Sequence, residues 1–192
     1  MRVIAGSARG RPLRAPPGGG IRPTTDLVKG AIFSMLEAEA MRHGDERFPY
    51  QRVLDLYAGS GALGIEALSR GSAFVDFLET DAQARAAIQR NLEATGFTTE
   101  GRVHARRAED APSTLLPPYD LILADPPYAY PGIVALLERV GNSQLLAEDG
   151  LFILEHARSF EPLDAVGCLR LDRVRAHGAT RIALFRRGER SG

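Results

Sequence analysis

Three closely spaced glycines, followed at a distance by an acidic residue, form the clearest chemical signature in this sequence. Gly59, Gly61 and Gly64 stand between an apolar run and a helical pattern, and Glu79 ends the next apolar run. Glycines at this spacing allow a tight turn and a close approach of the backbone to a ligand, and an acid at this position accepts hydrogen bonds from ribose hydroxyls. The pattern predicts a nucleoside-binding site; a glycine turn that serves packing alone is the alternative.

Asp55, four residues before the first glycine, indicates which nucleoside would bind. A dinucleotide such as NAD would bring its phosphates to this turn, where a carboxylate would repel them. S-adenosylmethionine has no phosphate and carries an ammonium and a sulfonium, which the same carboxylate attracts. Asp55 therefore favours S-adenosylmethionine, and a purely structural role as a hydrogen-bond acceptor is the alternative.

A second motif, Asp125-Pro126-Pro127-Tyr128, follows the apolar run YDLILA. Proline has no N–H, so the two prolines leave their carbonyl oxygens and the Asp125 carboxylate as a surface made of acceptors. Such a surface suits an amino group, because holding both hydrogens orients the nitrogen lone pair toward a methyl donor. The ring of Tyr128 can stack on a base. The motif alone could be a simple turn; beside the glycine signature it indicates methylation of an exocyclic amine.

Alternating strand and helix patterns position these residues. Apolar runs at 52–58, 73–79, 102–105, 119–125 and 151–156 predict five parallel strands, and residues 170–187 predict a terminal antiparallel pair. Between the second and third runs, Asp81–Thr95 has an N-cap residue, a helical stripe and a following glycine. We therefore predict an α/β, three-layer, Rossmann-like fold with a seven-stranded, mostly parallel sheet.

The N-terminal region differs in charge from the rest of a chain whose formal net charge is zero. Residues 1–25 contain five arginines and no acid, and they read as a short basic hairpin that ends at the PPGGG stretch of residues 16–20. A helix is expected to begin near Thr24-Thr25-Asp26, with Leu27 and Ile32 in its apolar stripe. We assign residues 1–40 to this extension and residues 41–192 to the sheet domain.

Composition excludes several functional classes. The chain has 192 residues and is 44% hydrophobic, as expected for one globular domain. Its single cysteine, Cys168, excludes a disulfide framework, and its four histidines lack the spacing of metal ligands. No apolar run approaches the roughly 18 residues of a membrane span. We therefore expect a cytoplasmic protein that uses neither a metal nor a membrane.

The two motifs together resemble those of class I S-adenosylmethionine-dependent methyltransferases that modify amino groups. Three longer segments narrow this resemblance: VIAGSARGRPL near the start, RPTTDLVKGAIFSML at 22–36 and LDLYAGSGALGIEALSRG at 54–71. They are similar to the RsmD family of bacterial 16S ribosomal RNA guanine-N2 methyltransferases, over essentially the whole chain. The resemblance implies methyl transfer from S-adenosylmethionine to the N2 amine of a guanine in 16S ribosomal RNA, within an assembling or assembled small subunit.

The resemblance also implies roles for individual residues. Asp125 and the Pro126 carbonyl would hold the guanine amine, with Pro127 in the same corner, and Tyr128 would stack on the base. The implied cofactor contacts are Asp55, Tyr57, Ala58, Gly59, Ser60, Gly61, Glu79, Thr80, Asp81 and Ala108. The implied RNA contacts are Arg9, Arg11, Arg14, Arg22 and Thr24.

Other functions remain compatible with the residues alone. An acceptor-lined pocket binds any planar amine, so adenine or cytosine in DNA and a protein glutamine are alternative substrates. A non-catalytic RNA-binding or ribosome-assembly factor could use the same fold, but the intact acidic residues and the Asp-Pro-Pro-Tyr motif oppose it. An NAD-dependent oxidoreductase is opposed by Asp55.

Overall fold

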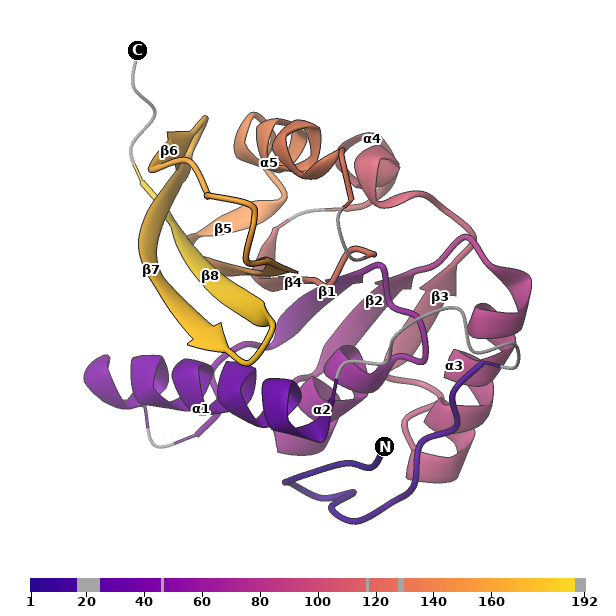
Figure 1. Cartoon of the computed structure of the whole chain (residues 1–192). Coiled ribbons are helices and arrows are strands. Elements are labelled where there is room, and N and C mark those ends of the chain that lie inside the picture. Colours follow the sequence, from indigo (N-terminus) through magenta and orange to yellow (C-terminus); the bar gives the residue numbers. More distant parts are fainter. Residues whose placement is uncertain (17–24, 46, 117, 128–129, 189–192) are drawn as a thin grey trace.

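The computed structural model describes residues 1–16, 25–45, 47–116, 118–127 and 130–188 (Figure 1). A single mixed sheet forms its centre, with the strand order β3-β2-β1-β4-β5-β8-β7-β6. The strands are β1 (Arg52–Leu56), β2 (Phe74–Leu78), β3 (Gly101–His104), β4 (Tyr119–Ala124), β5 (Leu146–Ala157), β6 (Ala165–Val166), β7 (Leu169–His177) and β8 (Thr180–Arg187). Strands β1 to β5 are parallel, and β8, β7 and β6 continue the sheet by antiparallel pairing.

The predicted fold class is confirmed, but the predicted number of strands is wrong. The described residues form eight strands instead of seven, and the additional strand is β6. This strand has two residues and pairs with β7 across a turn at Gly167, which has a φ of 58°. Two residues are too few to show the alternating pattern by which strands are recognised in a sequence.

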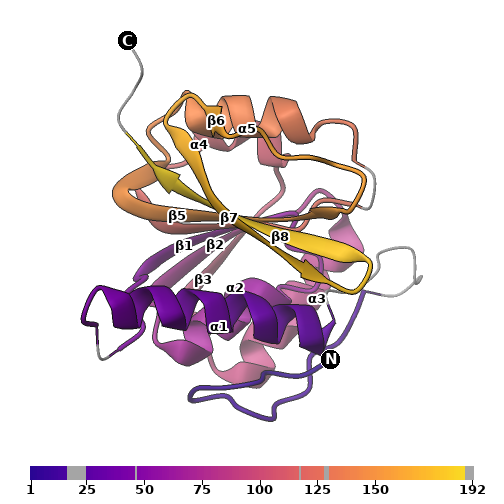
Figure 2. The ribbon, with the colours of Figure 1, turned by 60° about the vertical axis from the view of Figure 1, so that its left-hand side comes forward.

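Helices cover both faces of the sheet, as Figure 2 shows. One face carries α1 (Asp26–Arg42), α2 (Ala62–Arg70) and α3 (Ala82–Thr95). The other carries α4 (Ala111–Thr114) and α5 (Ile133–Gly141). The 3-10 turn η1 (Ala108–Asp110) belongs to the same layer, because its Ala108 shares a hydrophobic cluster with both helices. Two hydrophobic clusters, one on each side of the sheet, complete the three layers.

Two helices begin where their capping residues predict. The hydroxyl of Thr25 accepts a hydrogen bond from the amide of Val28, and the carboxylate of Asp81 accepts one from the amide of Ala84. The buried face of α1 differs from the predicted stripe, because Leu27 is 74% exposed whereas Lys29 is fully buried. The reason is an ion pair between Lys29 and Glu66 of α2, 3.3 Å from Nζ to Oε2, which turns the lysine inward.

The N-terminal arm, residues 1–16, doubles back on itself as the sequence predicts. Arg2 and Pro12 form an isolated antiparallel bridge, and the Val3 amide donates to the Arg11 carbonyl at 3.0 Å. The carboxylate of Glu66 accepts hydrogen bonds from the backbone amides of Ile4 and Ala5, at 2.8 and 2.9 Å. The arm is thereby fixed to the helical layer that contains α2.

None of the described helices combines the length and the apolar character that crossing a membrane requires.

Candidate active site

A cavity of about 820 Å³ opens at the carboxyl ends of the parallel strands. It lies where the strand order reverses between β1 and β4, the position at which open α/β sheets bind ligands. The predicted residues that line it are Asp55, Tyr57, Ala58, Gly59, Ser60, Glu79, Thr80, Asp81, Ala108, Asp125, Pro126 and Pro127. The topology therefore brings the two motifs, about seventy residues apart in the sequence, into one cavity.

The glycines of the first motif have separate structural tasks. Gly59 and Gly61 have φ values of 55° and 78°, in the left-handed region that favours glycine. Gly61 is the N-cap of α2 and is not among the residues that line the cavity. A Cβ on Gly64 would lie 2.3 Å from the ring of Phe77 and 2.8 Å from Val75, so this glycine lets α2 pack closely on β2.

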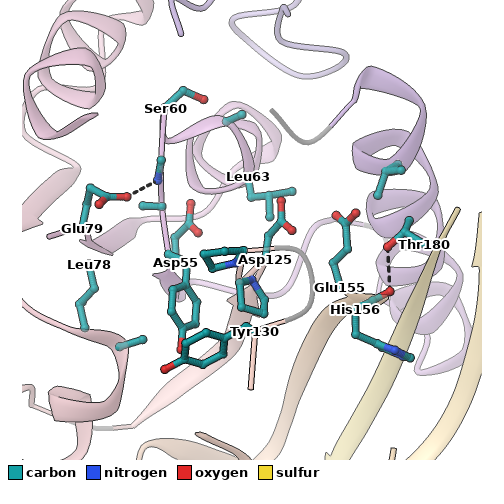
Figure 3. Close-up of a pocket in the computed structure, with 18 of the residues that line it drawn as sticks. Asp55, Ser60, Leu63, Leu78, Glu79, Asp125, Tyr130, Glu155, His156 and Thr180 are labelled. Atoms are coloured by element: carbon teal, nitrogen blue, oxygen red, sulfur yellow. Dashed lines mark hydrogen bonds between the residues drawn. The ribbon is translucent and has the colours of Figure 1, made fainter. Parts of the chain in front are cut away.

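Two buried acids hold the glycine turn in place. Asp55 accepts a hydrogen bond from the Gly64 amide at 2.9 Å. Glu79 accepts from the amides of Gly59 and Asp81, both at 2.8 Å (Figure 3). The backbone of the turn is thus oriented by side chains from the ends of two adjacent strands, which prepares the turn for a ligand before one binds.

The electrostatics of Asp55 are unusual. Its side chain is 99% buried, and no ion pair among the described residues joins it to a cation. Burial raises its pKa to about 8; the Gly64 hydrogen bond opposes this shift, and the charges of Asp125 and Glu79 add to it. A positive ligand would favour the ionised form, so the site is suited to a cation.

Tyr57 occupies a backbone conformation that side chains rarely adopt. Its φ is 60°, which makes it the only non-glycine residue with a positive φ among those described. Its hydroxyl donates to Glu109 Oε1 at 2.9 Å, and Tyr130 donates to the same oxygen. The two rings meet edge to face with centroids 5.6 Å apart. Strained residues of this kind persist where the surroundings hold them, frequently at functional sites.

The pKa values in this aromatic cluster follow from burial and from the shared carboxylate. Burial, followed by the hydrogen bonds with Tyr130 and Glu109, raises the pKa of Tyr57. Burial alone would raise the pKa of Glu109 as well, but the hydrogen bonds that it accepts outweigh this effect and lower its pKa. Glu109 is therefore an ionised acceptor that fixes both rings at the edge of the cavity.

The second motif forms a corner directly after β4. The side chain of Asp125 points into the cavity, and Pro126 and Pro127 line it (Figure 3). The Pro127 carbonyl accepts a hydrogen bond from the Tyr130 amide at 2.9 Å. Tyr128, predicted to stack on the base, lies outside the described residues.

The predicted RNA contacts are only partly described. Arg9, Arg11 and Arg14 are exposed on the N-terminal arm, while Arg22 and Thr24 lie outside the described residues. The side chain of Asn91 bonds to both backbone groups of Arg14, at 2.9 and 3.0 Å, and also donates to the Ser60 carbonyl at 2.8 Å. The buried side-chain amide of Asn91 therefore joins the N-terminal arm to the glycine turn.

Sequence reasoning missed the wall of the cavity formed by β5 and β8. Glu155 and His156 at the end of β5 line this wall, together with Thr180 at the start of β8. The Thr180 hydroxyl donates to the His156 carbonyl at 2.9 Å (Figure 3). A usable signal was present, because the run LFILEH ends in two titratable residues at the carboxyl end of a predicted parallel strand, and that edge faces the ligand crevice.

The strand order, the glycine turn after β1 and the acid after β2 together define the class I methyltransferase fold. A solved structure of the Escherichia coli protein yhhF has the same architecture, with a TM-score of 0.80, 29% sequence identity and coverage of 98% of each chain. The expectation of a Rossmann-like methyltransferase fold is therefore confirmed.

Comparison with known sequences narrows this class. The model of the family described as conserved hypothetical protein 95 matches residues 1–186. The chain is 39% identical over 190 residues to the Bacillus subtilis protein YlbH, covering 97% of this chain and 99% of YlbH. It is 32% identical over 155 residues to the ribosomal RNA small subunit methyltransferase D of Escherichia coli, covering 81% of this chain and 74% of that protein. The chain belongs to this family, that of the RsmD-type ribosomal RNA methyltransferases.

Proposed function

We propose that this protein transfers a methyl group from S-adenosylmethionine to the N2 amine of a guanine in 16S ribosomal RNA. One observation carries the proposal: the glycine turn with its two acids, Asp55 and Glu79, lines the same cavity as the Asp125-Pro126-Pro127 corner. The name of the Escherichia coli relative, a ribosomal RNA small subunit methyltransferase, supports the choice of acceptor. Family membership favours this reaction over an NAD-dependent oxidation and over a non-catalytic role.

The residues of the glycine turn fit S-adenosylmethionine by charge. Asp55 is buried without a cation partner among the described residues and faces Glu79 and Asp125, so a positive ligand would relieve their repulsion. Asp55 and the turn would hold the methionine part, Glu79 the ribose, and the segment around Ala108 the adenine. A cavity of about 820 Å³ lies within the usual size range of cofactor sites.

The protein's own contribution to the reaction is to orient the amine. When bound, S-adenosylmethionine supplies an electrophilic methyl group on a sulfonium, which is already a good leaving group. The Asp125 carboxylate and the Pro126 carbonyl accept the two amine hydrogens, which directs the nitrogen lone pair toward the methyl carbon. The amine would give up one proton during or after the transfer, to Asp125 or to water. The prolines contribute no competing N–H donors.

The basic arm supports an RNA substrate. Three exposed arginines, Arg9, Arg11 and Arg14, lie on a segment that Asn91 connects to the glycine turn. Arginines on such a segment contact phosphates and thereby position the RNA without selecting its sequence. The arm would place the RNA backbone beside the cavity, and the cavity would select the base.

The test is methyl transfer from labelled S-adenosylmethionine to 16S RNA that lacks methylation, offered both free and in assembled small subunits, with digestion of the product to nucleosides. N2-methylguanosine is the expected product. A methylated adenine or cytosine, or label in protein, would contradict the guanine assignment. No label on any acceptor would favour a non-catalytic factor.

Asp125→Ala is the decisive variant in this assay. We expect it to bind S-adenosylmethionine as the wild type does and to lose turnover roughly 100- to 1000-fold, because the amine loses its charged acceptor. Asp149→Ala is the matched control, since Asp149 is exposed and absent from the cavity lining. Unchanged turnover in Asp125→Ala would rule out the proposed role of the corner.

A further inference from the structure

Glu155 occupies the position on β5 that corresponds to Asp125 after β4. The two strands are parallel, and Ala124 and Leu154 are the last pair of their ladder, so Asp125 and Glu155 are the residues that directly follow this pair. Residues in register on adjacent parallel strands direct their side chains to the same face. Both residues line the cavity, and Figure 3 shows both carboxylates pointing into it side by side. The pocket therefore offers a second carboxylate next to the acceptor assigned to the amine.

The strand that carries Glu155 is held firmly. In the ladder between β5 and β8, Glu155 pairs with Ile182 and Ala157 pairs with Thr180. The hydrogen bond from the Thr180 hydroxyl to the His156 carbonyl adds a side-chain anchor at the end of the strand. These contacts fix the position of the Glu155 carboxylate relative to Asp125. A side chain that discriminates between ligands needs such a fixed position.

A second carboxylate beside the amine can distinguish guanine from adenine and cytosine. In guanine, the ring nitrogen N1 beside the 2-amino group carries a hydrogen. In adenine and cytosine, the ring nitrogen beside the exocyclic amine carries a lone pair instead. A carboxylate accepts a hydrogen bond from the first arrangement and repels the second. With the amine hydrogens held by Asp125 and Pro126, a neighbouring acceptor selects guanine.

We propose that Glu155 accepts a hydrogen bond from N1–H of the target guanine and so determines the base specificity of the site. This inference rests on the proposed function, because it takes the guanine amine to be held at Asp125. It assigns separate tasks to two adjacent carboxylates: Asp125 orients the reacting amine, and Glu155 distinguishes guanine from the other bases that carry an exocyclic amine.

The experiment compares two RNA substrates that differ only in the target base, at ring positions N1 and C6. The guanine that the wild type methylates is replaced by 2-aminopurine, which keeps the 2-amino group but has no hydrogen on N1. We expect the wild type to prefer guanine in kcat/KM by roughly 10- to 100-fold, because the Glu155 carboxylate accepts a hydrogen bond from N1–H of guanine and repels the N1 lone pair of 2-aminopurine. In Glu155→Gln the preference should fall to a few-fold, because the amide of glutamine can accept from one substrate or donate to the other.

Two further variants control for other effects. Glu148→Gln makes the same change on an exposed residue of β5 outside the cavity lining, and it should keep the full preference for guanine. Glu155→Asp retains the charge on a shorter side chain, so it should retain a preference for guanine at a lower rate. It therefore reports on specificity even if Glu155→Gln fails to fold.

The outcomes separate this inference from the proposed function. If the wild type makes N2-methylguanosine and Glu155→Gln keeps the wild-type preference for guanine over 2-aminopurine, Glu155 is not the specificity residue and the proposed function stands. A wild type that methylates both substrates equally would overturn the inference in the same way. A wild type that makes no N2-methylguanosine would overturn both.

Discussion

Two acids, Glu66 on α2 and Asp55 on β1, are equally buried, but their surroundings differ. Glu66 is fully buried and has two cations beside it, Lys29 at 3.3 Å and Arg70 at 2.9 Å, in addition to two backbone amides. Asp55 is 1% exposed and has one backbone amide, no cation partner among the described residues, and two further carboxylates near it. The first acid is neutralised by the protein itself, whereas the second faces a cavity.

This difference separates structural acids from functional ones. Glu39 follows the pattern of Glu66, because it is buried and pairs with Arg42, Arg173 and Arg186. A buried charge without a partner is costly, so the fold normally supplies one. Where it supplies none, at the edge of a cavity, the partner is expected to come with the ligand.

The largest expected effect concerns stability. Glu66→Ala leaves Lys29 buried without its main partner and leaves two amides of the arm unsatisfied, so we expect a loss of about 3–5 kcal/mol in the free energy of unfolding. Urea denaturation measures it. Glu37→Ala is the control, because Glu37 pairs with the same Arg70 from a half-exposed position. This variant should lower the free energy of unfolding by less than about 1 kcal/mol. Equal losses in the two variants would contradict the structural role of Glu66.

The second effect concerns ligand binding. Asp55→Asn keeps an oxygen that can accept from the Gly64 amide but removes the charge, so we expect binding of S-adenosylmethionine to weaken by roughly 30-fold or more. Stability near neutral pH should be unchanged or higher, because a buried, uncompensated acid is removed. Calorimetric titration and urea denaturation together measure both. If Asp55→Asn destabilised the fold as strongly as Glu66→Ala and left binding unchanged, the comparison between the two acids would fail.

The sequence predicts most of the machinery around Asp55, because that machinery depends on local patterns. The glycine turn, the helix caps and the Asp125 corner each occupy a few consecutive residues, and the parallel topology then places them at one edge. Lys29 escaped prediction for a different reason: its burial depends on Glu66, a partner 37 positions away, and such a relation leaves no periodic pattern in the sequence. The place of Glu155 at the end of the run LFILEH indicates a position at the cavity, but the residue beside it depends on the register between β5 and β4.

The third effect is a pH dependence that arises from Asp55. Because the pKa of Asp55 is raised to about 8, a cationic ligand must displace its proton below that pH, and binding should weaken by up to about tenfold per pH unit as the pH falls from 8. Before ligand binds, the same pKa makes the fold lose stability as the pH rises from about 4 toward 8, since the unfolded chain releases the proton first.

Asp55→Asn isolates this effect. The amide does not titrate, so the variant should lose the part of both pH profiles that belongs to Asp55, while any titration of the ligand remains. Binding titrations at pH 6, 7 and 8 on the wild type and the variant provide the measurement. Parallel profiles would show that Asp55 is already ionised in the free protein and that its carboxylate needs no cation.

The smallest effect tests whether uncharged contacts around the cavity matter as much as its charges. Tyr57→Phe removes the hydroxyl that donates to Glu109 but keeps the ring packed on Tyr130, and Glu109 retains the hydrogen bond from Tyr130. We expect a loss of about 1 kcal/mol in the free energy of unfolding and a change in S-adenosylmethionine affinity of less than threefold, or about 0.6 kcal/mol. A tenfold loss of affinity would place the hydroxyl on the ligand, so that Glu109 would join Asp55 as an acid whose surroundings are completed by what binds.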